Sequence, residues 1–234
     1  MKIDDTMHPA QVTILHALLF RPSANFSELQ KASKLSSDHF NFHLRQMIEQ
    51  GVVRKNDDGT YELTQAGKEY ANRFDTDERI VERQPKIGVL LVIEREDGKV
   101  LAQQRRKQPF YGYWGRMTGK VRWGETIYET AARELMEETG LEADHEFKAV
   151  YHKMDYKKDT DEMLEDKVFM LFHCTNPRGE LKVDFDGGHN EWLSTEDILK
   201  KEKVFEGINE VVDLVHAPGI QFAELKFYHD PKHY

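Results

Sequence analysis

The segment RELMEETG, residues 133–140, places three glutamates within five positions: Glu134, Glu137 and Glu138. Residues three or four apart share a face of a helix, where like charges cost roughly 0.2–0.5 kcal/mol per pair. The cluster becomes favourable around a hard divalent cation, because Mg²⁺ prefers oxygen ligands and keeps waters or substrate phosphates in its shell. Such a cation polarises a phosphoryl oxygen and lowers the pKa of a bound water. The alternative for the EETG run alone is a solvated acidic helix face.

The residues around this cluster predict the helix that would carry it. Thr126 and Glu129 form a T-x-x-E capping box, which predicts a helix beginning after the Gly124-Glu125 turn. Gly140 supplies the left-handed residue that commonly ends a helix. One side of this helix is apolar and is expected to be buried, through Ile127, Ala131 and Leu135.

The wider segment from Gly119 to Leu141 resembles the signature of the Nudix hydrolases. Gly119 is followed after five residues by Glu125, and after seven more by the Arg133-Glu134 pair that opens RELMEETGL. All nine defined positions of the signature agree across 23 residues. One neighbouring position departs from many family members, which have a glycine where this chain has Thr118.

The resemblance implies a fold and a metal site. The fold would be α+β, a Nudix α/β/α sandwich with a mixed sheet, and the cofactor Mg²⁺, with Mn²⁺ as an alternative. Glu134 and Glu138 would be the principal metal ligands, with contributions from Glu137 and the backbone carbonyl of Gly119. Glu134 and Glu137 would also take part in catalysis.

Two further residues are expected in the catalytic machinery. Arg133 would orient a glutamate, because a guanidinium binds a carboxylate in bidentate fashion. Many family members also draw an acid from a loop well after the motif, and Asp186 in DFDGGHNEW fits that position best, with Asp184 and Glu191 behind it. A polar turn around Gly187-Gly188 explains the same residues equally well.

Substrate recognition is less defined by the sequence. Arg122 and Trp123 lie inside the motif loop, Arg105 ends an expected strand, and Tyr113 belongs to the aromatic run PFYGYWG. Arginines would meet phosphates and an aromatic ring would stack on a base; surface charge and core packing are the alternatives. The expected substrate is a nucleoside diphosphate linked to another group, or a nucleoside triphosphate.

The first part of the chain has a different pattern, with short helices expected at 9–20, 25–35 and 36–50. A hairpin around Asp58-Gly59 and a helix at 65–74 follow. This order resembles the winged-helix domains of bacterial regulators. The positions that would contact DNA in such a domain are Ser37, His39, Asn41, Arg45 and Arg54.

The charge of the first part of the chain argues against strong DNA binding. Residues 1–80 hold ten Lys and Arg against twelve Asp and Glu, whereas phosphate contacts dominate DNA affinity. A module that docks protein is the alternative. A DNA-binding regulator whose Nudix domain senses a nucleotide such as ADP-ribose is accordingly the second hypothesis for the whole chain.

Composition and patterning set the overall expectations. The 234 residues, net charge −9, divide into a winged-helix domain at 1–75, a polar linker at 76–85 and a Nudix domain at 86–234. The single cysteine, Cys174, reads as a small buried hydrophobe. No secretory signal or membrane span is evident, which favours the cytoplasm. Expected partners are a nucleotide and, through the winged helix, DNA; a homodimer is left open.

Overall fold

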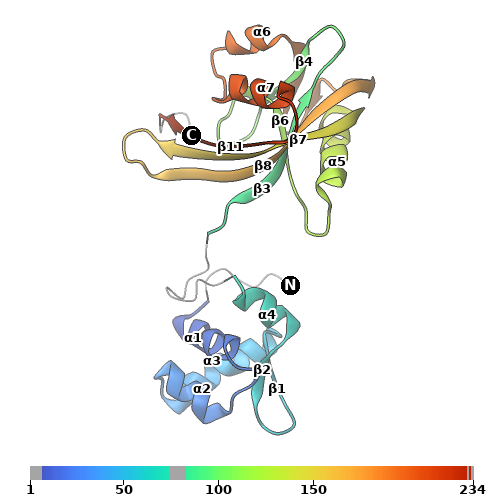
Figure 1. Ribbon diagram of the computed structural model, residues 1–234. Helices are drawn as coiled ribbons and strands as arrows, with labels where there is room; N and C mark the ends of the chain where they lie inside the picture. Colours follow the sequence, from blue (N-terminus) through green and yellow to red (C-terminus); the bar gives the residue numbers. More distant parts are fainter. Residues whose placement is uncertain (1–6, 74–82, 231, 233–234) are drawn as a thin grey trace. The chain divides into compact units, whose positions relative to one another are not determined.

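The computed structural model describes residues 7–73, 83–230 and 232. The chain divides into two compact units, 1–83 and 84–234, which are treated separately below (Figure 1). Most of the linker predicted at 76–85 lies outside the described residues. In the parts of the chain that are described, no helix is both long and apolar enough to cross a bilayer.

The N-terminal unit is a set of helices closed by a small hairpin, in the order the sequence predicts. Its elements are α1 (Pro9–Leu19), α2 (Phe26–Ser33), α3 (Ser37–Glu49), β1 (Val53–Lys55), β2 (Tyr61–Leu63) and α4 (Gln65–Ala71). Ile14 and Leu15 of α1 pack with Phe40 and Leu44 of α3 in a common core. Ile48 follows Met47 around the helix onto the outer face and is 36% exposed.

The C-terminal unit is built on a five-stranded sheet in the order β11-β7-β8-β3-β6. Its strands are β3 (Lys86–Ile93), β6 (Met117–Lys120), β7 (Leu141–Lys157), β8 (Met163–Gly179) and β11 (Gln221–His229). The β3–β8 and β7–β11 pairs are parallel, and the β7–β8 and β3–β6 pairs are antiparallel. The sheet is therefore mixed, as predicted.

A second sheet is antiparallel and has the order β5-β4-β10-β9. Its strands are β4 (Val100–Arg105), β5 (Trp114–Gly115), β9 (Asp184–Phe185) and β10 (Gly188–Leu193). The unit also contains three helices: α5 (Ile127–Thr139), α6 (Thr195–Leu199) and α7 (Ile208–His216).

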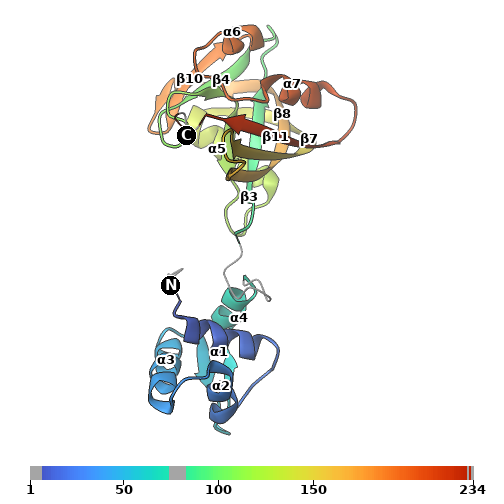
Figure 2. The same ribbon diagram turned by 90° about the vertical axis from the view of Figure 1, so that its left-hand side faces the viewer.

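The helices cover both faces of the five-stranded sheet (Figure 2). Ala131 and Leu135 of α5 pack with Leu91 of β3 in one apolar cluster. Ile208 and Val211 of α7 pack in a different cluster on the opposite face. Because side chains alternate across a strand, successive residues of β3 enter the two clusters in turn.

The end of the chain differs most from expectation. Helices α6 and α7 are separate, and Gly207 at the start of α7 has a φ of 93°. Within residues 180–185, only β9 pairs as a strand. Strand β11 was not predicted, because its exposed positions are charged or aromatic: Phe222, Glu224, Lys226 and Tyr228. Cys174 is fully buried, as predicted, and burial raises the pKa of its thiol to about 12.

Candidate active site

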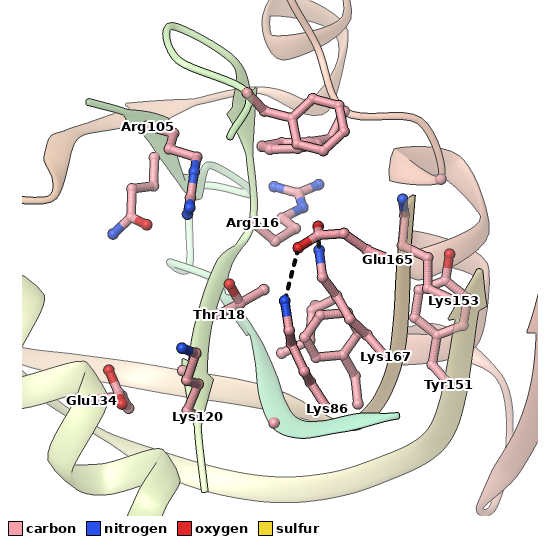
Figure 3. Close-up of a pocket in the computed structure, with 18 of the residues that line it drawn as sticks. Lys86, Arg105, Arg116, Thr118, Lys120, Glu134, Tyr151, Lys153, Glu165 and Lys167 are labelled. Atoms are coloured by element: carbon pink, nitrogen blue, oxygen red, sulfur yellow. Dashed lines mark hydrogen bonds and ion pairs between the residues drawn. The ribbon is translucent and has the colours of Figure 1, made fainter. Parts of the chain in front are cut away.

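A pocket of about 760 Å³ opens in the C-terminal unit, on the face of the sheet that α7 partly covers. Its lining comes from β3, β4, β6, β7 and β8, together with α5 and the segment that leads into α7. Glu134 and Glu138 of α5 line this pocket, and so does Gly119 of β6. Figure 3 shows Glu134 on the α5 side of the pocket and basic side chains on the strands opposite.

Helix α5 is fixed at both ends by the residues that predict it. At the start, the Thr126 hydroxyl accepts from the Glu129 backbone N–H at 3.3 Å, and the Glu129 carboxylate accepts from the Thr126 N–H at 2.8 Å. At the end, Gly140 has a φ of 72°. The capping box and the glycine stop are both confirmed, and together they set which face of α5 carries the glutamates.

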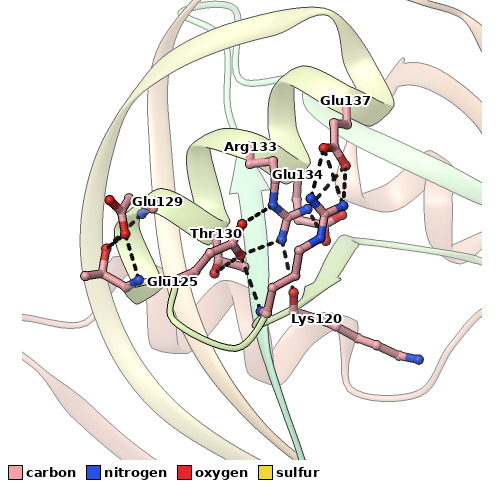
Figure 4. A network of polar contacts seen from close by, with 9 residues as sticks. Lys120, Glu125, Glu129, Thr130, Arg133, Glu134 and Glu137 are labelled. Atoms are coloured by element: carbon pink, nitrogen blue, oxygen red, sulfur yellow. Dashed lines mark hydrogen bonds and ion pairs between the residues drawn. The ribbon is translucent and has the colours of Figure 1, made fainter. Parts of the chain in front are cut away.

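Arg133 is the centre of a polar network at the edge of the pocket (Figure 4). Its Nε and Nη2 donate to the two carboxylate oxygens of Glu125, at 2.6 and 2.8 Å, and its Nη1 donates to Glu134 Oε1 at 2.8 Å. The Arg133 hydrogen bonds, with a further one from Thr130, hold the pKa of Glu125 at about 2. Arg133 therefore fixes the Glu134 carboxylate from behind.

Gly119 allows Glu134 to lie directly on the backbone of β6. A Cβ at position 119 would stand 2.1 Å from Glu134 Cγ and 2.3 Å from its Cδ. No side chain fits there unless Glu134 moves. The glycine is thus required by close approach rather than by backbone conformation.

Glu138 lies deeper than Glu134. Burial raises the pKa of its carboxyl group, and the nearby Glu134 carboxylate acts in the same direction. Gln103 Nε2 on β4 donates to Glu138 Oε2 at 2.9 Å and holds that oxygen in place. Gln103 was not singled out in the sequence, because its role depends on β4 lying beside α5.

The donor atoms suit a hard divalent cation. Glu134 and Glu138 present carboxylate oxygens to one pocket, and the charge of one carboxylate disfavours ionisation of the other, a cost that a cation would offset. Within the described ranges, no three His, Cys, Asp or Glu side chains converge as a group. Water or substrate oxygens would therefore complete the coordination shell, as is usual for Mg²⁺.

Two residues predicted for catalysis lie elsewhere. Glu137 is about half exposed, is ion-paired with Arg122 at 3.1 Å and Arg133 at 3.2 Å, and is not part of the pocket lining. Asp186 is exposed in the turn between β9 and β10 and also lies outside the lining. Gly188 pairs with Arg105, so this turn lies beside the end of β4.

The two residues considered behind Asp186 make surface ion pairs. Asp184 contacts Arg106 at 2.7 Å and His189 at 2.9 Å. Glu191 contacts Lys201 at 3.2 Å. None of the acids in the DFDGGHNEW loop lines the pocket.

Only part of the predicted substrate set lines the pocket. Arg105 and Arg122 do. Trp123 is 99% exposed and Tyr113 is buried against Phe205, and neither belongs to the lining. Their loops place them differently: Trp123 precedes α5 in an open turn, whereas Tyr113 fills the space beside β5.

Arg116 is a pocket residue that sequence reasoning missed. It is 8% exposed, and its Nη2 donates to Thr195 Oγ1 at 3.1 Å. Its Nε and Nη1 are buried without an acceptor among the described residues. Burial lowers its pKa to about 10, so it remains charged at neutral pH. The sequence offered one signal for Arg116: side chains alternate along a strand, and Arg116, Thr118 and Lys120, at every second position, all line the pocket.

The residues considered for DNA contact lie on α3 and β1 of the N-terminal unit. Ser37, His39 and Arg45 are exposed, and Asn41 is half-buried. Arg54 is exposed but is engaged by Glu62, to which its Nε donates at 2.6 Å. Of the two arginines considered for DNA contact, Arg45 on α3 has no ion-pair partner among the described residues, whereas Arg54 on β1 is paired with Glu62.

Comparison with known proteins agrees with the pocket and its motif. The NUDIX domain family model matches residues 84–215, and a domain of unknown function (DUF7347) matches residues 6–73. The chain is 32% identical over 108 residues to an oxidized purine nucleoside triphosphate hydrolase from Danio rerio, covering 46% of this chain. It is 42% identical over 57 residues to an ADP-ribose pyrophosphatase from Methanocaldococcus jannaschii, covering 24% of this chain.

These alignments span 66% and 33% of the two relatives' lengths. Among solved structures, the MutT protein from Bacillus halodurans superposes with a TM-score of 0.51 at 22% identity, covering 64% of this chain and 93% of that one. That likeness concerns the fold. The match of the family model over more than half of the residues shows that this chain belongs to the Nudix family.

Proposed function

We propose that this protein is a metal-dependent pyrophosphohydrolase that cleaves the pyrophosphate linkage of a nucleoside diphosphate derivative or a nucleoside triphosphate. One observation carries the proposal: Glu134 and Glu138 face the same pocket as Arg105 and Arg116. Carboxylates suit a divalent cation, and guanidinium groups suit phosphate oxygens. The names of the two relatives, both nucleotide hydrolases, point to the same class of reaction.

The residues divide the chemistry among them. Mg²⁺ or Mn²⁺ at Glu134 and Glu138 would neutralise phosphate charge and acidify a bound water. Arg133 holds Glu134, and Gln103 holds one oxygen of Glu138. The other oxygen, Glu138 Oε1, would be available to accept the proton of the attacking water as a general base. Water oxygen then bonds to one phosphorus as the bridging P–O bond breaks.

A substrate panel tests this proposal. The full chain is incubated with nucleoside triphosphates, ADP-ribose and other nucleoside diphosphate derivatives, with Mg²⁺ or with EDTA, and products are identified by ³¹P NMR. Cleavage within the pyrophosphate linkage in Mg²⁺ and its loss in EDTA are expected. Failure to hydrolyse every member of the panel, in Mg²⁺ and in Mn²⁺, would contradict the proposal.

A second function is carried by the N-terminal unit: sequence-specific DNA binding, with the Nudix unit as a nucleotide sensor. Its support is the order of three helices, a two-stranded hairpin and a helix, with Arg45 exposed on the third helix. In a winged helix that position faces the major groove.

Genomic DNA selection followed by gel shifts at physiological salt tests this second function. Specific binding is expected to weaken in Arg45→Ala and to persist in Arg21→Ala, an exposed arginine outside α3. Release of DNA by ADP-ribose would identify the sensor role. Equal binding to all sequences in both variants would exclude it.

A further inference from the structure

Three lysines form a row across the floor of the pocket, at positions far apart in the sequence. Lys86 of β3 is the register partner of Lys167 of β8, and Lys167 is the partner of Lys153 of β7. Residues directly opposite in neighbouring strands share one face of a sheet, and all three lysines line the pocket. Like charges placed directly opposite are destabilising. Lys86, Lys167 and Lys153 together form the lysine row.

Two carboxylates offset the lysine row. Lys86 Nζ lies 3.2 Å from Glu165 Oε1, and Lys167 contacts the other oxygen of Glu165 (Figure 3). Lys167 Nζ also lies 3.9 Å from Asp155 Oδ2, and Lys153 contacts Asp155 Oδ1. His229 Nε2 shares that oxygen at 2.7 Å. Glu206 also lines the pocket and acts on Lys153, so the three ammonium groups have three carboxylates near them: Glu165, Asp155 and Glu206.

The arrangement is buried on its inner side, and the pocket lining around it carries a surplus of positive charge, with eight Lys and Arg against four Glu. Lys153 is 8% exposed, Glu165 6% and Asp155 1%. Burial lowers the pKa of Lys153, which marks the cost of keeping it charged there. Arg105 adds another cation close to both Glu165 and Glu138. Its hydrogen bonds within the described part of the chain go to two backbone carbonyls, Pro109 at 2.6 Å and Gln108 at 3.2 Å.

Between the lysine row and the glutamates, the pocket floor holds Gly88 and Phe169 beside one further cation, Lys120. Gly88 lies one position beyond the row on the same face, in register with Phe169 on β8 and Lys120 on β6. A Cβ at Gly88 would stand 2.6 Å from the Gly119 carbonyl oxygen. Phe169 is itself the register partner of Tyr151. The middle of a substrate can lie on this floor, with one end over the lysine row and the other end at Glu134 and Glu138.

We propose that the lysine row, with Arg105, is a second anion-binding subsite for a phosphomonoester of the substrate. This rests on the proposed function: the pyrophosphate lies at Glu134 and Glu138, and the additional phosphate lies over the lysine row. The substrate class is then a nucleoside diphosphate derivative that carries a phosphomonoester away from the bond that is cleaved. A neutral base or sugar at this position would leave the surplus cation uncompensated.

Direct binding of inorganic phosphate in EDTA tests the subsite without any need for hydrolysis. The full chain is titrated with phosphate and followed by ³¹P and amide NMR. The variants are Lys86→Gln, Lys167→Gln and the control Lys200→Gln, whose side chain is 71% exposed at the end of α6. Glu134→Gln is included, because it should abolish hydrolysis and leave phosphate binding intact.

Saturable binding is expected in the wild type, Lys200→Gln and Glu134→Gln, and about tenfold weaker binding in Lys86→Gln and Lys167→Gln, since each removes a charge-assisted hydrogen bond. Circular dichroism checks that each variant is folded. Lys86 is the most exposed lysine of the row, so if Lys167→Gln does not fold, the result for Lys86→Gln tests the proposal. No saturable binding in the wild type, or equal binding in all variants, overturns the subsite.

Discussion

At the scale of the residue, the charged side chains in and around the pocket differ in how fully other described residues satisfy their hydrogen bonds. Arg133 donates to both carboxylate oxygens of Glu125 and to Glu134, so its guanidinium is engaged by protein groups and serves as a support. Arg116 differs, because its buried Nε and Nη1 have no acceptor among the described residues. Burying such donors costs folding free energy unless a ligand accepts from them. The first pair therefore has a positioning role, and Arg116 has a binding role.

Replacement of Arg116 by methionine should separate stability from activity. An apolar side chain of similar length removes a buried charge, so the free energy of unfolding should be unchanged or higher. The loss of charge-assisted hydrogen bonds to phosphate should lower kcat/KM about tenfold or more. Urea unfolding and steady-state kinetics on the best substrate measure both. An unchanged kcat/KM would remove Arg116 from the binding site.

At the scale of the element, α5 and the strands differ in how well they can be predicted. A capping box, an apolar stripe and a terminal glycine defined α5, because those signals are local. The lysine row was not predictable, since Lys86, Lys153 and Lys167 come together only through strand register. Gln103 and Arg116 were missed for the same reason, and Asp186 lies outside the pocket lining, in a β9–β10 turn whose place depends on pairing of β10 with β4.

Gly119 of β6 tests how closely α5 must approach the sheet. In Gly119→Ala the new Cβ would displace Glu134, whose Cγ lies 2.1 Å from that position. A displacement of about 1 Å is expected to lower kcat about a hundredfold. Circular dichroism should show an intact fold. Wild-type kcat in a folded Gly119→Ala protein would show that Glu134 need not occupy this place.

The attachment of β11 should depend on pH through His152 on β7. Its Nδ1 lies 2.9 Å from Glu224 on β11, and its Nε2 lies 2.7 Å from Asp166 on β8. These contacts raise the pKa of His152, with Glu224 contributing most. The resulting stability is therefore complete below the unfolded pKa of about 6.5 and is lost as pH rises through the higher folded value.

Urea unfolding at pH 6 and pH 8 measures this effect. The decrease in unfolding free energy between the two pH values should be larger in the wild type than in His152→Gln. The comparison cancels the contributions of the other histidines. An identical pH dependence in the two proteins would show that His152 does not hold β11.

At the scale of the whole molecule, all of the pocket belongs to one unit. Its lining residues run from Lys86 to Val211, within the unit 84–234. A compact unit with its own core is expected to fold alone. We therefore predict that the fragment 84–234 retains kcat/KM within about twofold of the full chain, because an intact pocket leaves transition-state binding unchanged. A large loss of activity in a folded fragment would show that residues 1–83 contribute to the site.

The central claim is that Glu134 and Glu138 hold the metal on which hydrolysis depends. Its most direct test is kcat/KM in Mg²⁺ for the wild type, Glu134→Gln, Glu138→Gln and the control Glu142→Gln, an exposed glutamate on β7. Each pocket variant should lose about a hundredfold or more, which corresponds to ~2.7 kcal/mol of transition-state stabilisation, and Glu142→Gln should match the wild type. Wild-type kcat/KM in both pocket variants would contradict the assignment of the site.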